Sequence, residues 1–222
     1  MELEGLEEFP TTIVKKIENE ISGNARKRSV SIWLPESWVW GDNCINLFNR
    51  IIKNVLFDKK QATGSQIVGK NSTHEKLKNS NRASGVLTFY FNDKKNKRAT
   101  DNRTAFKLSK SIGKYIEKHY DKEKGGVKVY GLTVLNGYHS MLITYGKNKE
   151  GKYEFNLFDQ GPATNYWDGQ STFSSAEDLD NAINKYVRNH QDKKTNSGNY
   201  FPATAEIFLI INDKKARDEN EK

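Results

Sequence analysis

Apolar residues in the first half of the chain recur at helical spacing. Residues 11–21 place Ile13, Ile17 and Ile21 four residues apart, after Pro10 and Thr11, which suit a helix start. Further along, steps of three and four residues connect Leu47, Phe48, Ile51, Ile52, Val55 and Leu56, and then Phe106, Leu108, Ile112, Tyr115 and Ile116. These steps predict three amphipathic helices, the second beginning at Asp42 or Asn43 as N-cap.

The pattern then changes to short apolar runs typical of strands. Strands are predicted at 86–91, 127–135, 139–145, 153–158 and 206–211, with a brief extended segment at 30–35. The turn at 146–151 joins the strands at 139–145 and 153–158 into an antiparallel hairpin. Ser174 and Glu177 form a predicted capping box, which opens a helix containing Leu179, Ile183, Tyr186 and Val187. Helices first and a sheet afterwards, with one crossing helix, predict an α+β fold.

Two polar segments interrupt this pattern. Residues 58–84 are rich in Lys, Asn, Ser and Gly without apolar periodicity, which predicts a long flexible surface loop. Residues 214–222 predict a frayed tail. A length of 222 residues allows either one domain or a domain with a sizeable appendage, and we expect a single domain over 1–222 that carries this loop and tail.

Composition narrows the classes of function. The formal charge of +8 favours anionic partners, and the mean hydropathy of −0.83 indicates a heavily solvated surface. The basic residues are spread through polar loops without interleaved aromatics, so a nucleic-acid groove is disfavoured. No apolar run is long enough to span a bilayer, and the acidic start is unlike a Sec-type signal, so we expect no membrane insertion.

The chain has a single cysteine, Cys44, in the first turn of the second predicted helix. Helix N-termini offer free N–H groups and the positive end of the dipole, both of which stabilise a thiolate and could hold an oxyanion. Cys44 also lies four residues before Phe48, so it could instead be a buried thiol on the apolar face of the helix.

A base for this thiol is suggested by the predicted hairpin. His139 opens one strand after a glycine-containing turn, and Asp159 directly follows the paired strand, so both lie at the end away from the turn. His74 and His190 lie in polar stretches and His119 closes a charged helix; all three are therefore expected on the solvated surface.

Both residues also have a structural interpretation. His139 could be a half-buried histidine satisfied by the backbone, and Asp159 could simply start the turn at 159–162. Gln160 is an alternative orienting group, because its amide oxygen can also accept from an imidazole N–H.

The chain order of Cys44, His139 and Asp159 resembles the papain-like superfamily, most closely its NlpC-type cell-wall peptidases and type VI secretion amidase effectors. The matching residues are 43–44 with the helix behind them, 137–140 and 158–159. The segments 138–141 and 158–161 also resemble papain-fold toxin domains of bacterial polymorphic toxins, some of which deamidate glutamine. The chain departs from NlpC enzymes in lacking their Asp-Cys-Ser-Gly motif and in carrying the 58–84 segment.

The resemblance implies a papain-like or NlpC-like fold, with a nucleophile helix packed on an antiparallel sheet. Cys44 would be the nucleophile, His139 the base and Asp159 the orienter. Trp40, Asn43, Gln160 and Trp167 would contact substrate, although core packing is an alternative role for the tryptophans.

The implied activity is that of a cysteine amidase or endopeptidase that cleaves peptidoglycan peptides. Such an effector would be delivered by a specialised secretion system, would act in the target periplasm and would be neutralised by an immunity protein. The alternatives are a glutamine deamidase or protease acting on protein, and a non-catalytic basic binding module. No zinc spacing, phosphate loop or dinucleotide motif is present in the sequence, so we expect no metal and no cofactor.

Overall fold

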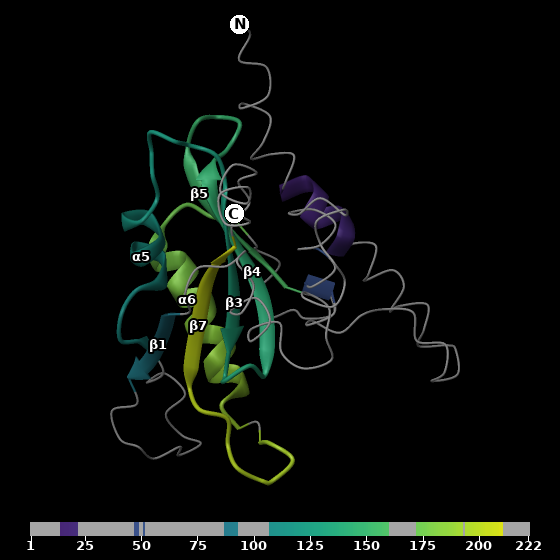
Figure 1. Cartoon of the computed structure of the whole chain (residues 1–222). Coiled ribbons are helices and arrows are strands. Elements are labelled where there is room, and N and C mark those ends of the chain that lie inside the picture. The colour runs from purple at the N-terminus through teal and green to yellow at the C-terminus, as the bar shows by residue number, and fades with distance from the viewer. Residues whose placement is uncertain are drawn as a thin grey trace, which may run out of the picture.

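The computed structural model describes residues 14–21, 47–48, 51, 87–92, 107–159, 172–192 and 194–210. Within these ranges an antiparallel sheet lies between helices on its two faces (Figure 1). The predicted α+β class is therefore confirmed. That the whole chain forms one domain stays a prediction.

Seven strands of the described part of the chain form the sheet, in the order β2-β1-β7-β3-β4-β5-β6. Every neighbouring pair is antiparallel. The strands are β1 (Leu87–Asn92), β2 (Lys107–Leu108), β3 (Lys128–Val134), β4 (His139–Lys147), β5 (Tyr153–Phe158), β6 (Thr172–Phe173) and β7 (Thr204–Ile210). Strands β3 and β4 are almost wholly buried because both faces of the sheet are covered, which explains their apolar character.

One face of the sheet, called here the α6 face, packs against α5 (Ile112–Lys118) and α6 (Ala176–His190). Leu179, Ile183 and Val187 of α6 are fully buried there. The helices are joined to each other by a hydrogen bond from the Gly113 N–H to Asp180 Oδ1, 3.0 Å long. Burial raises the pKa of the Asp180 carboxyl above its usual value. Helix α6 is thus fixed both to the sheet and to its neighbour.

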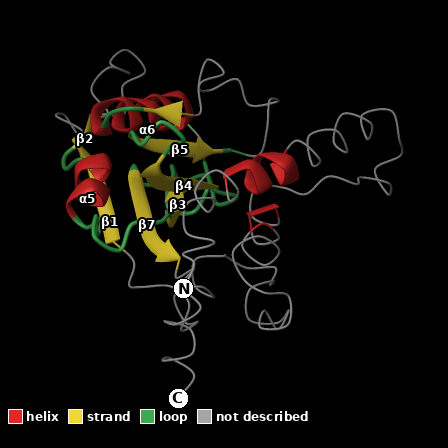
Figure 2. Ribbon diagram, turned by 90° about the horizontal axis from the view of Figure 1, so that it is seen from above, coloured by secondary structure: helices red, strands yellow, loops and turns green. Residues whose placement is uncertain are grey.

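The opposite face, called here the N-terminal face, is covered by helical residues from the start of the chain. A buried cluster on this face combines side chains of four strands with helical residues of two segments. The helical residues are Ile17, from the helix at 14–21, and Leu47, Phe48 and Ile51. The strand members are Val129, Leu142, Phe158, Phe208 and Ile210. Figure 2 shows the helix at 14–21 across the sheet from α5 and α6. The described residues that follow Cys44 therefore pack on this face of the sheet.

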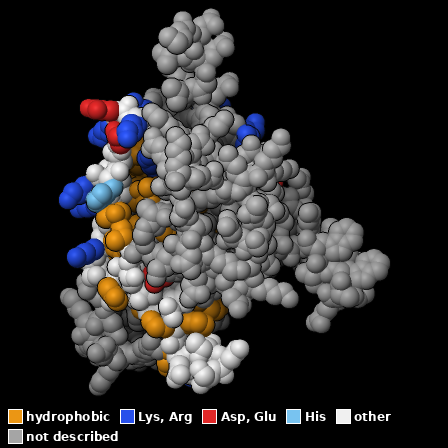
Figure 3. Space-filling model, viewed as in Figure 1, with side chains coloured by type: hydrophobic (Ala, Val, Ile, Leu, Met, Phe, Trp, Pro, Cys, Tyr) orange, Lys and Arg blue, Asp and Glu red, His pale blue; other side chains and the backbone are white. Residues whose placement is uncertain are grey.

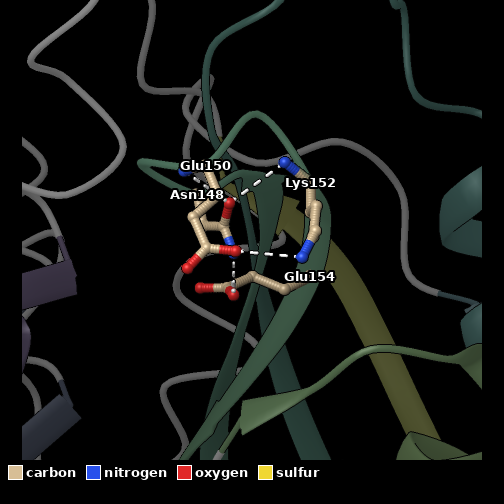
Figure 4. A network of polar contacts seen from close by, with 4 residues as sticks. All are labelled: Asn148, Glu150, Lys152 and Glu154. Atoms are coloured by element: carbon tan, nitrogen blue, oxygen red, sulfur yellow. Dashed lines mark hydrogen bonds and ion pairs between the residues drawn. The ribbon is translucent and has the colours of Figure 1, made fainter.

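The register of the β4–β5 hairpin is fixed at its turn by a small polar network (Figure 4). Asn148 Oδ1 accepts from the N–H groups of Glu150 and Lys152, each at 3.0 Å, and its amide donates to Glu154. Gly151 sits at φ 76°, a conformation that glycine adopts without strain. The turn fixes which residues face one another along both strands, up to the Leu142–Phe158 pair at the other end.

Most elements predicted from the sequence agree with the structure. The helix at 14–21 and strands β1, β3, β4, β5 and β7 lie within two or three residues of the expected bounds. The segment at 30–35, the loop at 58–84 and the tail at 214–222 lie outside the described residues.

Two predicted boundaries are wrong. The helix expected over 106–116 begins only at Ile112, because Leu108 and Lys107 pair with β1 and Ser111 caps the helix by accepting from the Lys114 N–H. The capping box lies one residue later than predicted: Ser175, not Ser174, accepts from the backbone N–H of Asp178.

Gly131 makes the packing on the N-terminal face possible. It lies between Leu142 and Phe208 in register, and the Phe208 ring lies over it where a Cβ would otherwise stand. We expect Gly131→Ala to lower the free energy of unfolding by about 1–3 kcal/mol, because the added methyl collides with this ring.

Urea unfolding of Gly131→Ala in the wild type and in a Phe208→Leu background measures this effect. The smaller side chain of the Phe208→Leu background should reduce the cost of the alanine. Equal costs in the two backgrounds would contradict the steric explanation.

Candidate functional site

His139 and Asp159 lie together at the end of the hairpin that is far from its turn. His139 is the first residue of β4, and Asp159 follows Phe158, the last residue of β5. Alternation along the strands places both side chains on the α6 face, with Met141 and Leu157. His139 Nε2 and Asp159 Oδ1 are 2.6 Å apart. The contact expected between these two residues is therefore confirmed.

The pair is almost completely removed from water. His139 is 5% exposed and Asp159 is 7% exposed. A carboxylate oxygen accepts, so the imidazole Nε2–H donates to Asp159 and the ring is held in one tautomer. Exchange of a proton with any other group then passes through Nδ1. This arrangement can hold an imidazole base in a fixed position. Because the pair is buried, removal of either partner leaves the other polar group buried without this contact.

The His139 ring also stacks on Tyr186 of α6. The ring centroids are 5.1 Å apart and the planes differ by 14°. The Tyr186 ring also stacks with His190, whose ring is 4.2 Å away at the same interplanar angle. His190 Nδ1 lies 2.8 Å from the Tyr186 carbonyl oxygen, which accepts its hydrogen bond. Tyr186 therefore stacks both with His139 at the start of β4 and with His190 at the end of α6, and these ring contacts are called here the stack.

The expectation that His190 lies on the solvated surface is wrong, because it is 5% exposed. The missed signal was periodicity: Tyr186 and His190 are four residues apart on the helical stripe that includes Leu179 and Ile183. The stripe identifies Tyr186 as a core residue, but no local pattern indicates that it touches His139. His119 is exposed at the end of α5, as expected, and His74 lies outside the described residues.

The other predicted site residues lie outside the described residues: Cys44, Trp40, Asn43, Gln160 and Trp167. The described residue nearest to Cys44 in the sequence is Leu47, which belongs to the buried cluster of Leu142 and Phe158 on the N-terminal face. These two residues belong to β4 and β5, the strands that carry His139 and Asp159, but they point to the opposite side of the sheet.

The surface over α5 is basic. Lys110, Lys114 and Lys118 are exposed at four-residue intervals, and Figure 3 shows blue side chains along this margin of the molecule. The acidic residues Glu117 and Glu123 are exposed in the same stretch of chain.

Within the described ranges, no three His, Cys, Asp or Glu side chains gather as metal ligands would, and no helix is long and apolar enough to cross a membrane.

The mutual dependence of His139 and Asp159 can be measured as a coupling energy. We expect Asp159→Ala and His139→Ala each to destabilise the fold by about 3 kcal/mol, because each leaves a buried polar partner behind. The loss of unfolding free energy in the double variant should be smaller than the sum of the two single losses by at least about 1 kcal/mol.

Urea unfolding of the three variants tests this, with His119→Ala as the control histidine. His119→Ala and Asp159→Ala should be additive within about 0.5 kcal/mol, because the two residues share no contact. Additivity of His139→Ala and Asp159→Ala would instead show that the 2.6 Å contact contributes nothing to stability.

Comparison of the chain with protein-family models, with curated proteins and with solved structures finds no match. A function is therefore inferred from the sequence pattern and from the geometry around His139.

Proposed function

We propose that this protein is a papain-like cysteine hydrolase acting on amide bonds, with Cys44 as nucleophile, His139 as general base and Asp159 as orienting carboxylate. The observation that carries the proposal is the buried hydrogen bond of 2.6 Å between His139 and Asp159. A base held by a buried carboxylate is the arrangement that activates serine and cysteine nucleophiles in unrelated folds.

Asp159 performs two tasks in this arrangement. By accepting from Nε2–H it leaves Nδ1 as the nitrogen that exchanges protons with the thiol. Its negative charge also stabilises the imidazolium that forms when His139 takes a proton. Both tasks depend on the charge and position of the carboxylate.

The position of Leu47 sets a condition on the proposed role of Cys44. In a continuous helix, three residues correspond to about 4.5 Å along the axis. Leu47 belongs to the buried cluster of Leu142 and Phe158, and Phe158 immediately precedes Asp159. The proposal requires the thiol to lie beyond the ends of β4 and β5, because over the N-terminal face the sheet would separate it from the imidazole.

The reaction follows from these roles. The Cys44 proton passes to His139 Nδ1, and the thiolate sulfur attacks the amide carbonyl carbon. Collapse of the tetrahedral intermediate breaks the C–N bond, and the imidazolium gives its proton to the departing nitrogen. Water, deprotonated by His139, then attacks the thioester; the acid is released and the thiol is restored.

The proposed substrate is the peptide part of peptidoglycan. The charge of +8 attracts the chain to an anionic polymer. Around the proposed nucleophile and base, the sequence also resembles that of cell-wall peptidases. We propose that the protein is a secreted effector of this type, and that its natural inhibitor is an immunity protein that occludes the Cys44 thiol.

The reactivity of Cys44 tests the catalytic class. We expect iodoacetamide to alkylate the folded protein rapidly at neutral pH, because the imidazole accepts the thiol proton. His139→Ala should slow alkylation by about a hundredfold, the lower range of a general-base effect.

The control for this measurement is His119→Ala, which removes an exposed histidine and should leave the rate unchanged. Slow labelling of the wild type that is insensitive to His139→Ala would show that Cys44 is a structural thiol, and would favour a binding module.

Product analysis tests the substrate. Purified peptidoglycan fragments incubated with the wild-type protein should yield new peptide termini in a mass spectrum, and Cys44→Ala should yield none. An unchanged cell wall together with a gain of about 1 Da on a glutamine of a target protein would contradict wall hydrolysis, because replacing NH₂ with OH is the signature of deamidation.

A further inference from the structure

We propose that Tyr186 is a positioning residue that sets the plane of the His139 imidazole, and that His190 holds Tyr186 in place by stacking on its ring. This inference rests on the proposed function, since it concerns the base of that reaction. It assigns a task to two buried side chains of α6 that the triad itself does not use.

The hydrogen bond to Asp159 directs Nε2 but does not by itself set the plane of the imidazole. The ring can still tilt through small rotations about its Cα–Cβ and Cβ–Cγ bonds. Such a tilt moves Nδ1, the nitrogen that must face the thiol. The stack on Tyr186 removes this freedom, because two aromatic rings 5.1 Å apart and only 14° from parallel prefer to keep their faces together.

Tyr186 can serve as a fixed platform because it is itself held by contacts with His190. The His190 ring stacks on it at 4.2 Å, and the hydrogen bond between His190 Nδ1 and the Tyr186 carbonyl connects the two residues across one turn of helix. The ring of Tyr138, adjacent to His139 in sequence, lies 6.1 Å from His190 and 5.0 Å from Phe201. Tyr138, from the turn before β4, therefore lies beside His190 and also contacts Phe201 from the segment before β7.

Helix α6 supplies the rigidity that this platform needs. Its start is capped by Ser175, its middle is tied to α5 through Asp180, and its apolar stripe is buried on the sheet. Precise placement of a reacting group matters because small displacements of a base away from its partner cost large factors in rate. Tyr186 acts through His139, and no contact with substrate is required of it.

The experiment compares Tyr186→Leu with Tyr186→Phe and with the control Tyr145→Leu. Tyr145 is also a buried tyrosine, located in β4 on the same face as His139, but it packs on Tyr120, Tyr153 and Phe155 near the other end of the strand. It reports what the loss of a buried aromatic ring does to the fold without touching the stack.

The first readout is the exchange rate of the His139 Nε2 proton, followed by nuclear magnetic resonance in a Cys44→Ala background. Tyr186→Leu should accelerate exchange about tenfold, the scale of one lost aromatic pair. Tyr186→Phe, which keeps both ring faces, and Tyr145→Leu should stay within about twofold of the parent. An unchanged rate in Tyr186→Leu, or the same acceleration in Tyr145→Leu, would overturn the proposal.

The second readout is the alkylation rate of Cys44 in the same three variants. Tyr186→Leu should lower it about tenfold, and Tyr186→Phe should restore it. Because the exchange measurement lacks the thiol, the two proposals can fail separately. Accelerated exchange with slow, His139-independent alkylation would retain the positioning role and remove the proposed hydrolase.

Discussion

The hydrogen bond between His139 and Asp159 exists because strands β4 and β5 pair in one register. The pairing of Leu142 with Phe158 brings the residues beyond it to the same end and the same face of the sheet. A slip of one residue would turn Asp159 to the opposite face from His139 and abolish the contact. The turn around Asn148, at the other end of the hairpin, therefore determines the geometry of the candidate site.

Burial of both sheet faces enforces this register. Phe155 and Leu157 fit the core on the α6 face, whereas Phe158 fits the cluster on the N-terminal face. A change of register would turn the side chains of each face toward the other face, where they would be exposed or would clash with their new neighbours. The same burial gives the site its character: His139 lies between a carboxylate and an aromatic ring, with little water, so its position is determined by packing as well as by hydrogen bonding.

The hairpin could be predicted from the sequence because its information is local. Short apolar runs, a glycine-containing turn and a histidine that opens the strand are visible without knowledge of the fold, and they placed His139 beside Asp159. The short strand β2 could not be predicted, since Lys107 and Leu108 become a strand only by pairing with β1. Leu108 and Ile112 are separated by a helical step, and tertiary pairing overrode that spacing.

The burial of His190 was missed for a different reason. Its neighbours Asn189, Gln191 and Asp192 are polar, and composition suggested a solvated segment. A helix end can be polar in sequence while one side chain turns back to the core, and only the position of Tyr186 four residues earlier would have indicated this. The stack with His139 joins two elements 47 positions apart, from residue 139 to residue 186, which no local pattern reports.

The proposed mechanism requires the His139 imidazole to face the Cys44 thiol through Nδ1. This can be tested by recording the ¹⁵N chemical shifts of the His139 ring before and after Cys44 is alkylated, with the ring nitrogens assigned through the Asp159 bond. The mechanism predicts a clear change at Nδ1, which loses its thiol partner, and little change at Nε2, which keeps the carboxylate. Two unchanged nitrogens on a fully alkylated protein would contradict it.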